Sequence, residues 1–390
     1  MVPLAEIQDA LRAQGIPGWL FYDHHQRDPL AYRVLRFDPH RTPTRRWYYF
    51  IPAVGDPLAL VHRVEPGMLD GLPGRRQVYS SWQSMCDGLR EMLAGVGKVA
   101  MQWSPECAIP YISLVDGGMI DLVRGFDIEV VSSAGLVQYF EARWSEAQFD
   151  MHVEAGRRVD AARRAAFQKI SEAIRGGTPI DEYQVASFLR EYFASHGLFT
   201  DHGPIVAVNA NASNPHYEPE PASAAAIRSG DVVLIDLWAK LTQPDAVYYD
   251  ITWTGYCGRD IPAGIQKVFA VVKGARDAAV EFIRDGIAAG RTLRGFEVDD
   301  VARGFITDKG YGDAFVHRTG HSIGVEVHGA GANMDNLESH DTRQLIPQIC
   351  FSIEPGVYLE HFGIRSEVNV YIGAKEAIVT GEIQEALLEL

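Results

Sequence analysis

The chain has 390 residues, of which 47% are hydrophobic and 22% are charged, a composition typical of globular proteins rather than disordered ones. Its 36 Lys and Arg against 51 Asp and Glu give a formal charge of −15. This charge argues against nucleic-acid binding, which needs clustered positive residues. The sequence lacks an apolar run of about 18 residues and an apolar leader, so we expect no membrane span and no signal peptide. The four cysteines form no CxxC pair, which favours free thiols in the cytoplasm.

The first third of the chain alternates between helical and extended patterns. Helices are expected over residues 3–14, 82–94 and 115–124, and strands over 18–22, 47–51, 58–61, 98–103 and 127–131. Such alternation predicts an α/β domain with a mixed sheet. Its aromatic clusters GWLFY and WYYFI fit either a dimer surface or an ordinary core.

The pattern changes near residue 140. Residues 144–175 form one long amphipathic helix pattern, with Ser145 as the N-cap and Gly176-Gly177 as the stop. A second helix is expected over 181–196. We therefore predict two domains, an N-terminal α/β domain over 1–143 and a second domain over 144–390.

The second domain becomes rich in strands and punctuated by Gly and Pro after residue 204. Strands are expected over 231–236, 247–254, 350–353 and 363–371, interrupted by helices over 262–285 and 297–309. This arrangement predicts an α+β domain, and it contains nearly all the polar residues that are unusual for their surroundings.

Four carboxylates stand in these strand patterns. A lone Asp236 at a strand end would be read as a turn or a helix cap. Asp250, in VYYDITWT, needs a partner or a metal if its strand is half-buried, and a hairpin would bring it near Asp236. Glu354 and Glu367 also interrupt runs of good strand formers, where Glu is disfavoured.

The segment HRTGHSIGVEVHG adds three histidines, His317, His321 and His328. Each alone would be read as a hydrogen-bonded structural residue. Together, and beside glycines that let a backbone approach a ligand, they favour a binding site.

Clustered carboxylates cannot all ionise unless positive charge is supplied. Arg318 and Arg365 are the only arginines in the relevant segments, too few to neutralise four acids. Oxygen donors with one imidazole suit Mn, Co, Zn or Fe, held as a pair roughly 3.5 Å apart in two-metal hydrolytic enzymes.

These residues, in this order, resemble the pita-bread metallopeptidases, a family that includes prolidases (Xaa-Pro dipeptidases), aminopeptidases P and the metal-free creatinases. The resemblance rests on GHSIGVEVHG, SIEPGVY and GIRSE, together with NPHYEP. It implies a pita-bread catalytic domain over 144–390. It also implies a smaller creatinase-type domain over 1–143, with roles in oligomerisation and substrate access.

The resemblance also implies a ligand set for two divalent metal ions, with manganese preferred over cobalt or zinc. Asp236 would chelate one ion, His321 and Glu354 would bind the other, and Asp250 and Glu367 would bridge the two. A hydroxide shared by the ions would attack the scissile carbonyl.

The remaining roles implied by the resemblance concern the substrate. Glu354 would act as general base and then acid, while His216 and His328 would orient the substrate and stabilise the tetrahedral intermediate. His317 would line the pocket, and Arg365 would contact a metal ligand or a substrate carboxylate.

The resemblance implies hydrolysis of the Xaa-Pro bond, with proline-containing dipeptides or short peptides as substrates. Prolidase activity on dipeptides is the first expectation, in a cytoplasmic homodimer without nucleic-acid or membrane partners. Aminopeptidase P activity on Xaa-Pro-Yaa peptides is the alternative. A non-catalytic binding protein is a third reading, disfavoured because such relatives typically lose metal ligands.

Two features depart from the family pattern. The Asp236 to Asp250 segment is a few residues longer than usual, has Trp238 where a small residue is common, and offers Tyr248 or Tyr249 as the nearest match to a family tyrosine. Ser366 in GIRSE replaces an apolar residue or Gly. Both departures bear on the substrate pocket and on metal retention.

Overall fold

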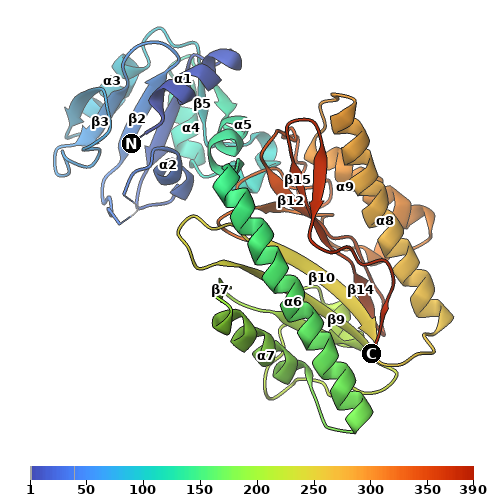
Figure 1. The fold of residues 1–390 in the computed structure, drawn as a ribbon. Coiled ribbons are helices and arrows are strands. Elements are labelled where there is room, and N and C mark those ends of the chain that lie inside the picture. Colours follow the sequence, from blue (N-terminus) through green and yellow to red (C-terminus); the bar gives the residue numbers. More distant parts are fainter. Residues whose placement is uncertain (1, 39) are drawn as a thin grey trace. The chain divides into compact units, whose positions relative to one another are not determined.

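The computed structural model describes residues 2–38 and 40–390. The chain divides into two compact units, Met1–Glu141 and Ala142–Leu390 (Figure 1). In the part of the chain that the structure describes, no helix has the length and apolar character needed to cross a membrane.

The first unit is built on a six-stranded mixed sheet in the order β4-β3-β2-β1-β5-β6. Its strands are β1 (Gly18–Asp23), β2 (Trp47–Pro52), β3 (Leu58–His62), β4 (Arg75–Tyr79), β5 (Lys98–Met101) and β6 (Glu129–Ser132). Its α-helices are α1 (Leu4–Ala13), α2 (Pro29–Val34), α3 (Trp82–Met92), α4 (Gly117–Arg124) and α5 (Ala134–Val137). Strand β1 pairs antiparallel with β2 and parallel with β5, so the expected mixed sheet is confirmed.

The aromatic clusters of the first unit belong to its core. Strands β1 and β2 carry them side by side, and Trp19, Tyr48 and Tyr49 are fully buried. The core reading of GWLFY and WYYFI therefore holds for these side chains.

The second unit begins with two helices, α6 (Glu146–Gly176) and α7 (Glu182–Ser195). Ser145 caps α6 by accepting a hydrogen bond from the backbone N–H of Gln148, whose side chain accepts from the Ser145 N–H in return. Gly177 ends the helix in the left-handed conformation with φ of 66°, which glycine adopts without steric cost. The start and stop signals in the sequence are thus confirmed.

Two main sheets form the centre of the second unit. One contains β7 (Leu198–Phe199), β8 (Ile205–Val208), β9 (Val232–Leu241), β10 (Tyr249–Tyr256) and β17 (Leu388–Glu389). The other has the order β11-β12-β15-β16, with strands Ser322–Ile323, Cys350–Ile353, Val368–Ile372 and Ala377–Thr380. A small hairpin joins β13 (Gly356–Tyr358) and β14 (Gly363–Arg365).

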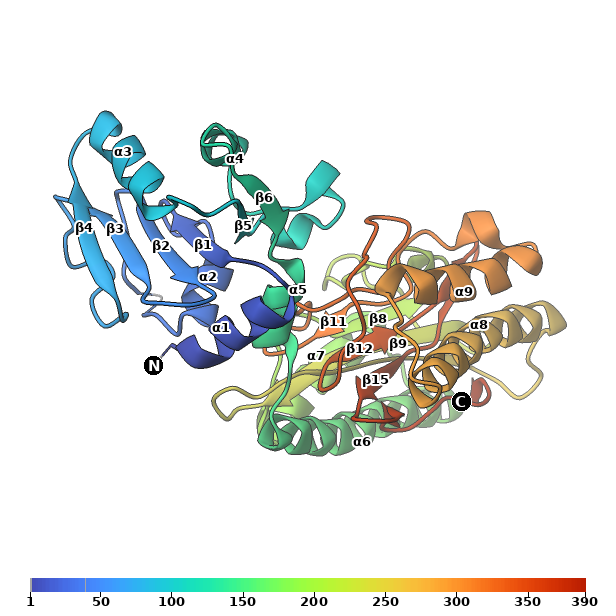
Figure 2. The same ribbon diagram turned by 90° about the horizontal axis from the view of Figure 1, so that it is seen from above.

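Helices cover the sheets from two sides. Helices α6 and α7 share one apolar core with β9 and β10, while α8 (Ala263–Ala288) and α9 (Gly295–Asp308) share another with β12 and β15 (Figure 2). The polar site residues lie between these two cores.

The single strand expected over 363–371 is wrong. The chain forms β14 up to Arg365, which pairs with β13, and then β15 from Val368, which pairs with β12 and β16. The break at Ser366 and Glu367 moves the chain from one pairing partner to another. The short elements α2, β4 and β8 were not anticipated from sequence.

Candidate metal centre

The β9–β10 hairpin presents two of the carboxylates. Asp236 lies opposite Thr252 and Asp250 lies opposite Trp238 in the antiparallel register. Because side chains two residues apart on a strand share a face, Asp236 and Asp250 point to the same side of the sheet. Both side chains are buried.

Three more residues come from the ends of strands in the other sheet. His321 precedes β11, Glu354 follows β12, and Glu367 precedes β15. Strands β12 and β15 pair with Ile353 opposite Val368, so the two glutamates leave the ladder at the same end. The backbone is held there because the Glu367 N–H donates to the Thr252 carbonyl at 3.1 Å.

The two sheets bring their acidic residues and one histidine together. Ligand atoms of Asp250, His321 and Glu367 all lie within 4.8 Å of one another. The Nε2 atom of His321 lies 3.5 Å from Asp250 Oδ2 and 3.4 Å from Glu354 Oε1. Asp236 is near enough that its charge acts on Asp250.

The protonation of His321 is fixed by its backbone contact. Its Nδ1 lies 3.2 Å from the Ser322 carbonyl, which only accepts hydrogen bonds, so Nδ1 carries the proton. Burial and the neighbouring His328 lower the pKa of His321 well below its usual range, so the ring is neutral. The Nε2 lone pair therefore faces carboxylate oxygens, an arrangement that suits a cation between them.

The carboxylates also lack enough positive charge around them. Asp250 Oδ1 and Glu367 Oε1 are buried and have no hydrogen-bond partner among the described residues. Burial, Asp236 and Glu354 raise the pKa of Asp250 well above its usual range, and burial and Asp250 do the same for Glu367. Burial also raises the pKa of Glu354, to about 7. Buried oxygens without partners, beside a neutral imidazole, fit divalent cations.

One arginine does enter the cluster. The Arg365 guanidinium pairs with Asp236, lies 3.8 Å from Glu354 Oε2, and donates to Thr252 Oγ1 at 3.0 Å. The charge of Arg318 also acts on Glu354. Two arginine charges still leave four carboxylates undercompensated, which agrees with the expectation that arginines alone would be too few. Thr252 Oγ1 in turn donates to Glu367 Oε2 at 2.8 Å, so it links Arg365 to Glu367.

A tyrosine that the sequence analysis did not single out links Arg365 to His317. The Tyr358 hydroxyl accepts from Arg365 Nη1 at 3.1 Å and lies 2.6 Å from His317 Nε2. His317 Nδ1 donates to the Arg318 carbonyl at 2.7 Å, so Nε2 accepts the tyrosine proton. Burial, reinforced by Arg365, lowers the pKa of His317 to about 3. Tyr358 lies in SIEPGVY, four residues after Glu354. Its place in that motif is the one feature of the sequence that could have marked it as a site residue.

Other supporting contacts come from neutral side chains. Ser352 accepts from the His321 N–H at 2.9 Å and donates to Glu354 Oε1 at 3.2 Å. Asn369 bonds both the N–H and the carbonyl of Asp250, at 3.2 and 2.7 Å. These contacts fix the backbone and side chains of three expected ligands.

The two remaining expected substrate residues lie on the rim. The ring of His328 packs edge-on against His321, with centroids 4.2 Å apart. His216 lies in an exposed turn, and its charge acts on His328. His328 thus lies beside the cluster, and His216 is near enough to His328 for its charge to act there.

The two departures from the family pattern have structural roles. The Trp238 indole donates to Asp201 Oδ1 at 3.1 Å and fills the space beside Gly203. Ser366 Oγ accepts from the buried Arg276 Nη1 at 2.7 Å, which explains a polar residue at that position. Tyr248 and Tyr249 point to opposite faces of the hairpin, as neighbours on a strand do.

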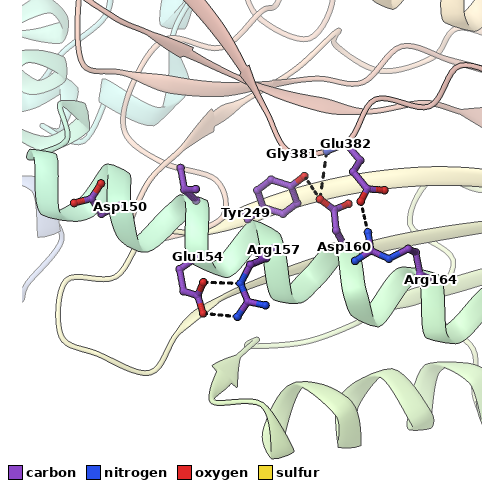
Figure 3. A pocket seen from close by; sticks show the side chains of 9 residues that line it. Asp150, Glu154, Arg157, Asp160, Arg164, Tyr249, Gly381 and Glu382 are labelled. Atoms are coloured by element: carbon purple, nitrogen blue, oxygen red, sulfur yellow. Dashed lines mark hydrogen bonds and ion pairs between the residues drawn. The ribbon is translucent and has the colours of Figure 1, made fainter.

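A pocket lies on the face of β10 opposite Asp250, beside α6 (Figure 3). Its volume is about 400 Å³, and its lining includes Glu154, Arg157, Asp160, Tyr249 and Glu382. The sequence analysis predicted nothing here.

The donor set on this two-sheet fold fits a divalent-cation centre, as in a metalloprotein. The sequence profile of Metallopeptidase family M24 matches residues 150–374, which is more than half of the chain. The chain therefore belongs to metallopeptidase family M24.

Individual relatives agree with this family. The Xaa-Pro dipeptidase of Lactobacillus delbrueckii subsp. lactis is 34% identical over 205 residues, which cover 52% of this chain and 50% of the relative. The uncharacterized peptidase YqhT of Bacillus subtilis (strain 168) is 31% identical over 256 residues, covering 63% of this chain and 64% of the relative. The matched segments thus span only half to nearly two thirds of these relatives.

Solved structures share the fold along nearly the whole chain. The dipeptidase PepE from Mycobacterium ulcerans superposes with a TM-score of 0.70 at 22% identity, covering 99% of this chain and 96% of that one. The prolidase from Thermococcus sibiricus gives a TM-score of 0.63 at 23% identity, covering 99% and 98%. The predicted fold class, a pita-bread domain preceded by a smaller creatinase-type domain, is confirmed.

Proposed function

We propose that this chain is a metal-dependent peptidase that hydrolyses Xaa-Pro dipeptides. The observation that supports the proposal is the buried cluster of Asp250, His321, Glu354 and Glu367, in which two carboxylate oxygens lack partners. Membership of the M24 family and the name of the Lactobacillus relative, Xaa-Pro dipeptidase, support the substrate class.

Two divalent ions are proposed for the cluster, with manganese preferred over cobalt or zinc. Their ligands would be Asp236, Asp250, His321, Glu354 and Glu367. When bound, such ions supply positive charge, lower the pKa of water and polarise a carbonyl. Asp236 would then share its carboxylate between an ion and the guanidinium of Arg365.

The chain's own residues have distinct proposed tasks. Glu354, held by Ser352, would accept and return a proton through a carboxylate oxygen. His328 and His216 would orient the peptide and hydrogen-bond the oxygen that gains charge. His317 would line the pocket, and its bond to Tyr358 would hold Arg365 on Asp236.

The family resemblance also supports proposals about the assembly. Residues 1–143 would serve oligomerisation and substrate access in a cytoplasmic homodimer. Light scattering of the purified chain tests the dimer, since a monomer at micromolar concentration would contradict it.

A substrate panel tests the function. We expect manganese-loaded protein to cleave Xaa-Pro dipeptides, and a chelator to stop the reaction until Mn or Co is restored. Cleavage of Xaa-Pro-Yaa tripeptides in preference to dipeptides would favour the aminopeptidase P alternative. Full activity after exhaustive metal removal would contradict both.

A further inference from the structure

The break between β14 and β15 carries two residues of the candidate site. Arg365 is the last residue of β14 paired with β13, and Val368 is the first residue of β15 paired with β12. In the described strand ladders, Ser366 and Glu367 therefore have no partner, and the Ser366 N–H lies as far as 3.5 Å from the Pro355 carbonyl. Contacts other than strand pairing must hold the chain at this break.

The buried Arg276 of α8 supplies such contacts. Its Nη1 donates to Ser366 Oγ at 2.7 Å and to the Gln384 carbonyl at 2.8 Å. Its Nε and Nη2 donate to Asp277 Oδ1 at 2.9 and 2.7 Å. Because that carboxylate balances its charge, Arg276 acts on the break through directed hydrogen bonds rather than as a free cation.

Further hydrogen bonds connect Arg276 to strand β10. Gln384 Oε1 accepts from the Thr254 N–H at 3.0 Å, and Gln384 Nε2 donates to the Thr254 carbonyl at 2.6 Å. Thr254 Oγ1 donates to the carbonyl of Arg365, the residue before Ser366, at 3.0 Å. The Arg276 network, which consists of Arg276, Ser366, Thr254 and Gln384, is fully buried. A buried network whose hydrogen bonds are satisfied favours one backbone arrangement.

The Arg276 network adjoins the candidate metal centre along β10. Asp250, Thr252 and Thr254 share one face of this strand because they are two residues apart. Thr252 contacts Arg365 and Glu367, and Thr254 belongs to the network. A shift of the chain at the break would therefore move the Glu367 carboxylate relative to Asp250, with which it is proposed to bridge two ions.

Arg276 and Ser366 depend on each other. With an apolar residue or Gly at position 366, as in the family pattern, the buried guanidinium would lose one acceptor. With an apolar residue at position 276, the buried serine oxygen would lose its donor. Either loss leaves a buried polar group without that partner, which is costly.

We propose that Arg276 is a positioning residue, which acts through Ser366 to set where the chain crosses from β14 to β15 and so holds Glu367 in place to bind both ions. This inference rests on the proposed function, and it adds a residue that touches neither an ion nor the peptide. Removing a residue that supports a metal ligand typically lowers metal affinity or activity by about 10- to 100-fold.

The manganese affinity, measured by calorimetry, tests the proposal without using activity. We expect Arg276→Met to raise the Kd of the weaker-bound ion by about 10-fold, and Ser366→Ala to raise it by about 3-fold, since the guanidinium then keeps its bond to Gln384. The double variant should match Arg276→Met, because both changes break the same bond. Arg163→Met on α6 is the matched control: it removes another buried arginine with acidic partners, and the Kd should stay within about two-fold.

Hydrogen exchange in chelator tests the backbone directly. The Glu367 N–H donates to the Thr252 carbonyl, so amides of residues 365–368 should exchange about 10-fold faster in Arg276→Met. Amides of α7, which lies outside the network, should keep the wild-type rate, whereas a general loss of stability would speed both. At saturating manganese, kcat for Ala-Pro should fall by about 10-fold with KM within about two-fold, because a metal ligand rather than the peptide site is displaced.

The possible results are distinguishable. A Kd in Arg276→Met within about two-fold of wild type overturns the proposal, as does a double variant whose Kd rises by the product of the single changes. If Arg276→Met does not fold, Ser366→Ala decides, and an unchanged Kd and exchange rate in that variant overturn the role of Arg276. A wild type that cleaves no Xaa-Pro peptide overturns the proposed function, and the affinity and exchange measurements then still decide the role of Arg276.

Discussion

The two faces of β10 carry similar numbers of charged groups but balance them differently. On the face of Asp250, four carboxylates meet the guanidinium of Arg365 and the nearby charge of Arg318, and two buried oxygens have no hydrogen-bond partner among the described residues. On the face of Tyr249, toward α6, Glu154, Asp160 and Glu382 each lie beside an arginine, although Asp160 Oδ1 also has no hydrogen-bond partner among the described residues (Figure 3). The contrast indicates that the first face requires a cation from outside the chain, whereas the second supplies its own.

The compensated face is held by a chain of contacts across α6. Arg163 and Arg164 both pair with Glu382, and Arg163 Nη2 lies 3.5 Å from the buried Asp160. The Arg163 guanidinium also lies 3.4 Å from the ring centroid of Trp253. Density of charge alone therefore does not mark a functional site; an uncompensated excess of one sign does.

The largest effect is expected when the uncompensated face loses the imidazole of His321, which faces the carboxylates of Asp250 and Glu354. His321→Ala should lower Xaa-Pro hydrolysis by about 10³-fold or more, since a lost metal ligand removes several kcal/mol of transition-state stabilisation. Metal analysis by mass spectrometry should show reduced occupancy, while circular dichroism should stay close to that of the wild type. Retained peptidase activity in this variant would sink the assignment of the site.

On the compensated face, removing a cation should cost stability and leave the metal centre intact. Arg163→Met leaves Asp160 buried without its ion pair, so we expect a loss of about 3 kcal/mol in unfolding free energy. Urea denaturation measures this loss of unfolding free energy, and the metal content of Arg163→Met should equal that of the wild type. Arg157→Met is the matched control, because the Arg157 pair with Glu154 is exposed and should cost no more than about 0.5 kcal/mol. Loss of metal in Arg163→Met would contradict the separation of the two faces.

The metal-free protein should reveal the excess of negative charge through its pH dependence. The folded-state pKa of Glu354 is about 7, above its usual value of 4.5, because burial disfavours the ionised form. The folded protein therefore binds this proton more tightly than the unfolded chain, and that contribution is present at low pH and lost as pH rises from 4.5 through about 7. Folding lowers the pKa of the buried His317 from 6.5 to about 3, so its own contribution to the pH dependence overlaps this range, and a variant is needed to isolate Glu354.

Glu354→Gln lacks the titrating carboxyl, so comparing it with wild type, both in chelator, isolates the contribution of Glu354. Relative to this variant, wild type should lose on the order of 3 kcal/mol of unfolding free energy between pH 4.5 and 8. Urea denaturation at several pH values measures the difference, in which the histidine contributions cancel. A difference that stays constant with pH would show that Glu354 is not forced to share its cavity with other acids.

Much of the fold was predictable because its signals are local. The periodicity of α6 and its flanking Ser145 and Gly177 fixed a long helix, and apolar strand runs located β9, β10 and β12. The break between β14 and β15 was missed because GIRSEVNVY reads as one continuous strand. The segment is divided because its first part, β14, pairs with β13 and its second part, β15, pairs with β12. These pairings depend on residues outside the segment.

The candidate site followed a similar rule. Acids in strand patterns stand out because ionised groups are disfavoured there, so Asp250 and Glu367 drew attention from sequence alone. Thr252 and Tyr358 are ordinary strand residues, and only the folded chain shows that they hold Arg365. The pairing of Arg365 with Asp236 joins residues far apart in sequence, which no local pattern reports.

The smallest expected effect concerns the residue next to Asp250. The Tyr249 hydroxyl donates to Asp160 Oδ2 at 3.2 Å, and its ring packs against Gly156 and Gly381 (Figure 3). Tyr249→Phe keeps the ring and removes one hydrogen bond, so we expect a loss of about 1 kcal/mol in urea denaturation. Since the Glu382 N–H still donates to Asp160 at 3.3 Å, the carboxylate keeps a partner.

Activity of the same variant decides how independent the two faces are. Because adjacent strand residues point to opposite sides, Tyr249→Phe should keep kcat/KM for Ala-Pro within about two-fold of wild type, and metal content should be unchanged. A ten-fold loss of activity with unaltered stability would instead mean that the α6 face positions Asp250 through the backbone of β10. The charge balance of that face would then be part of the catalytic design as well as of the fold.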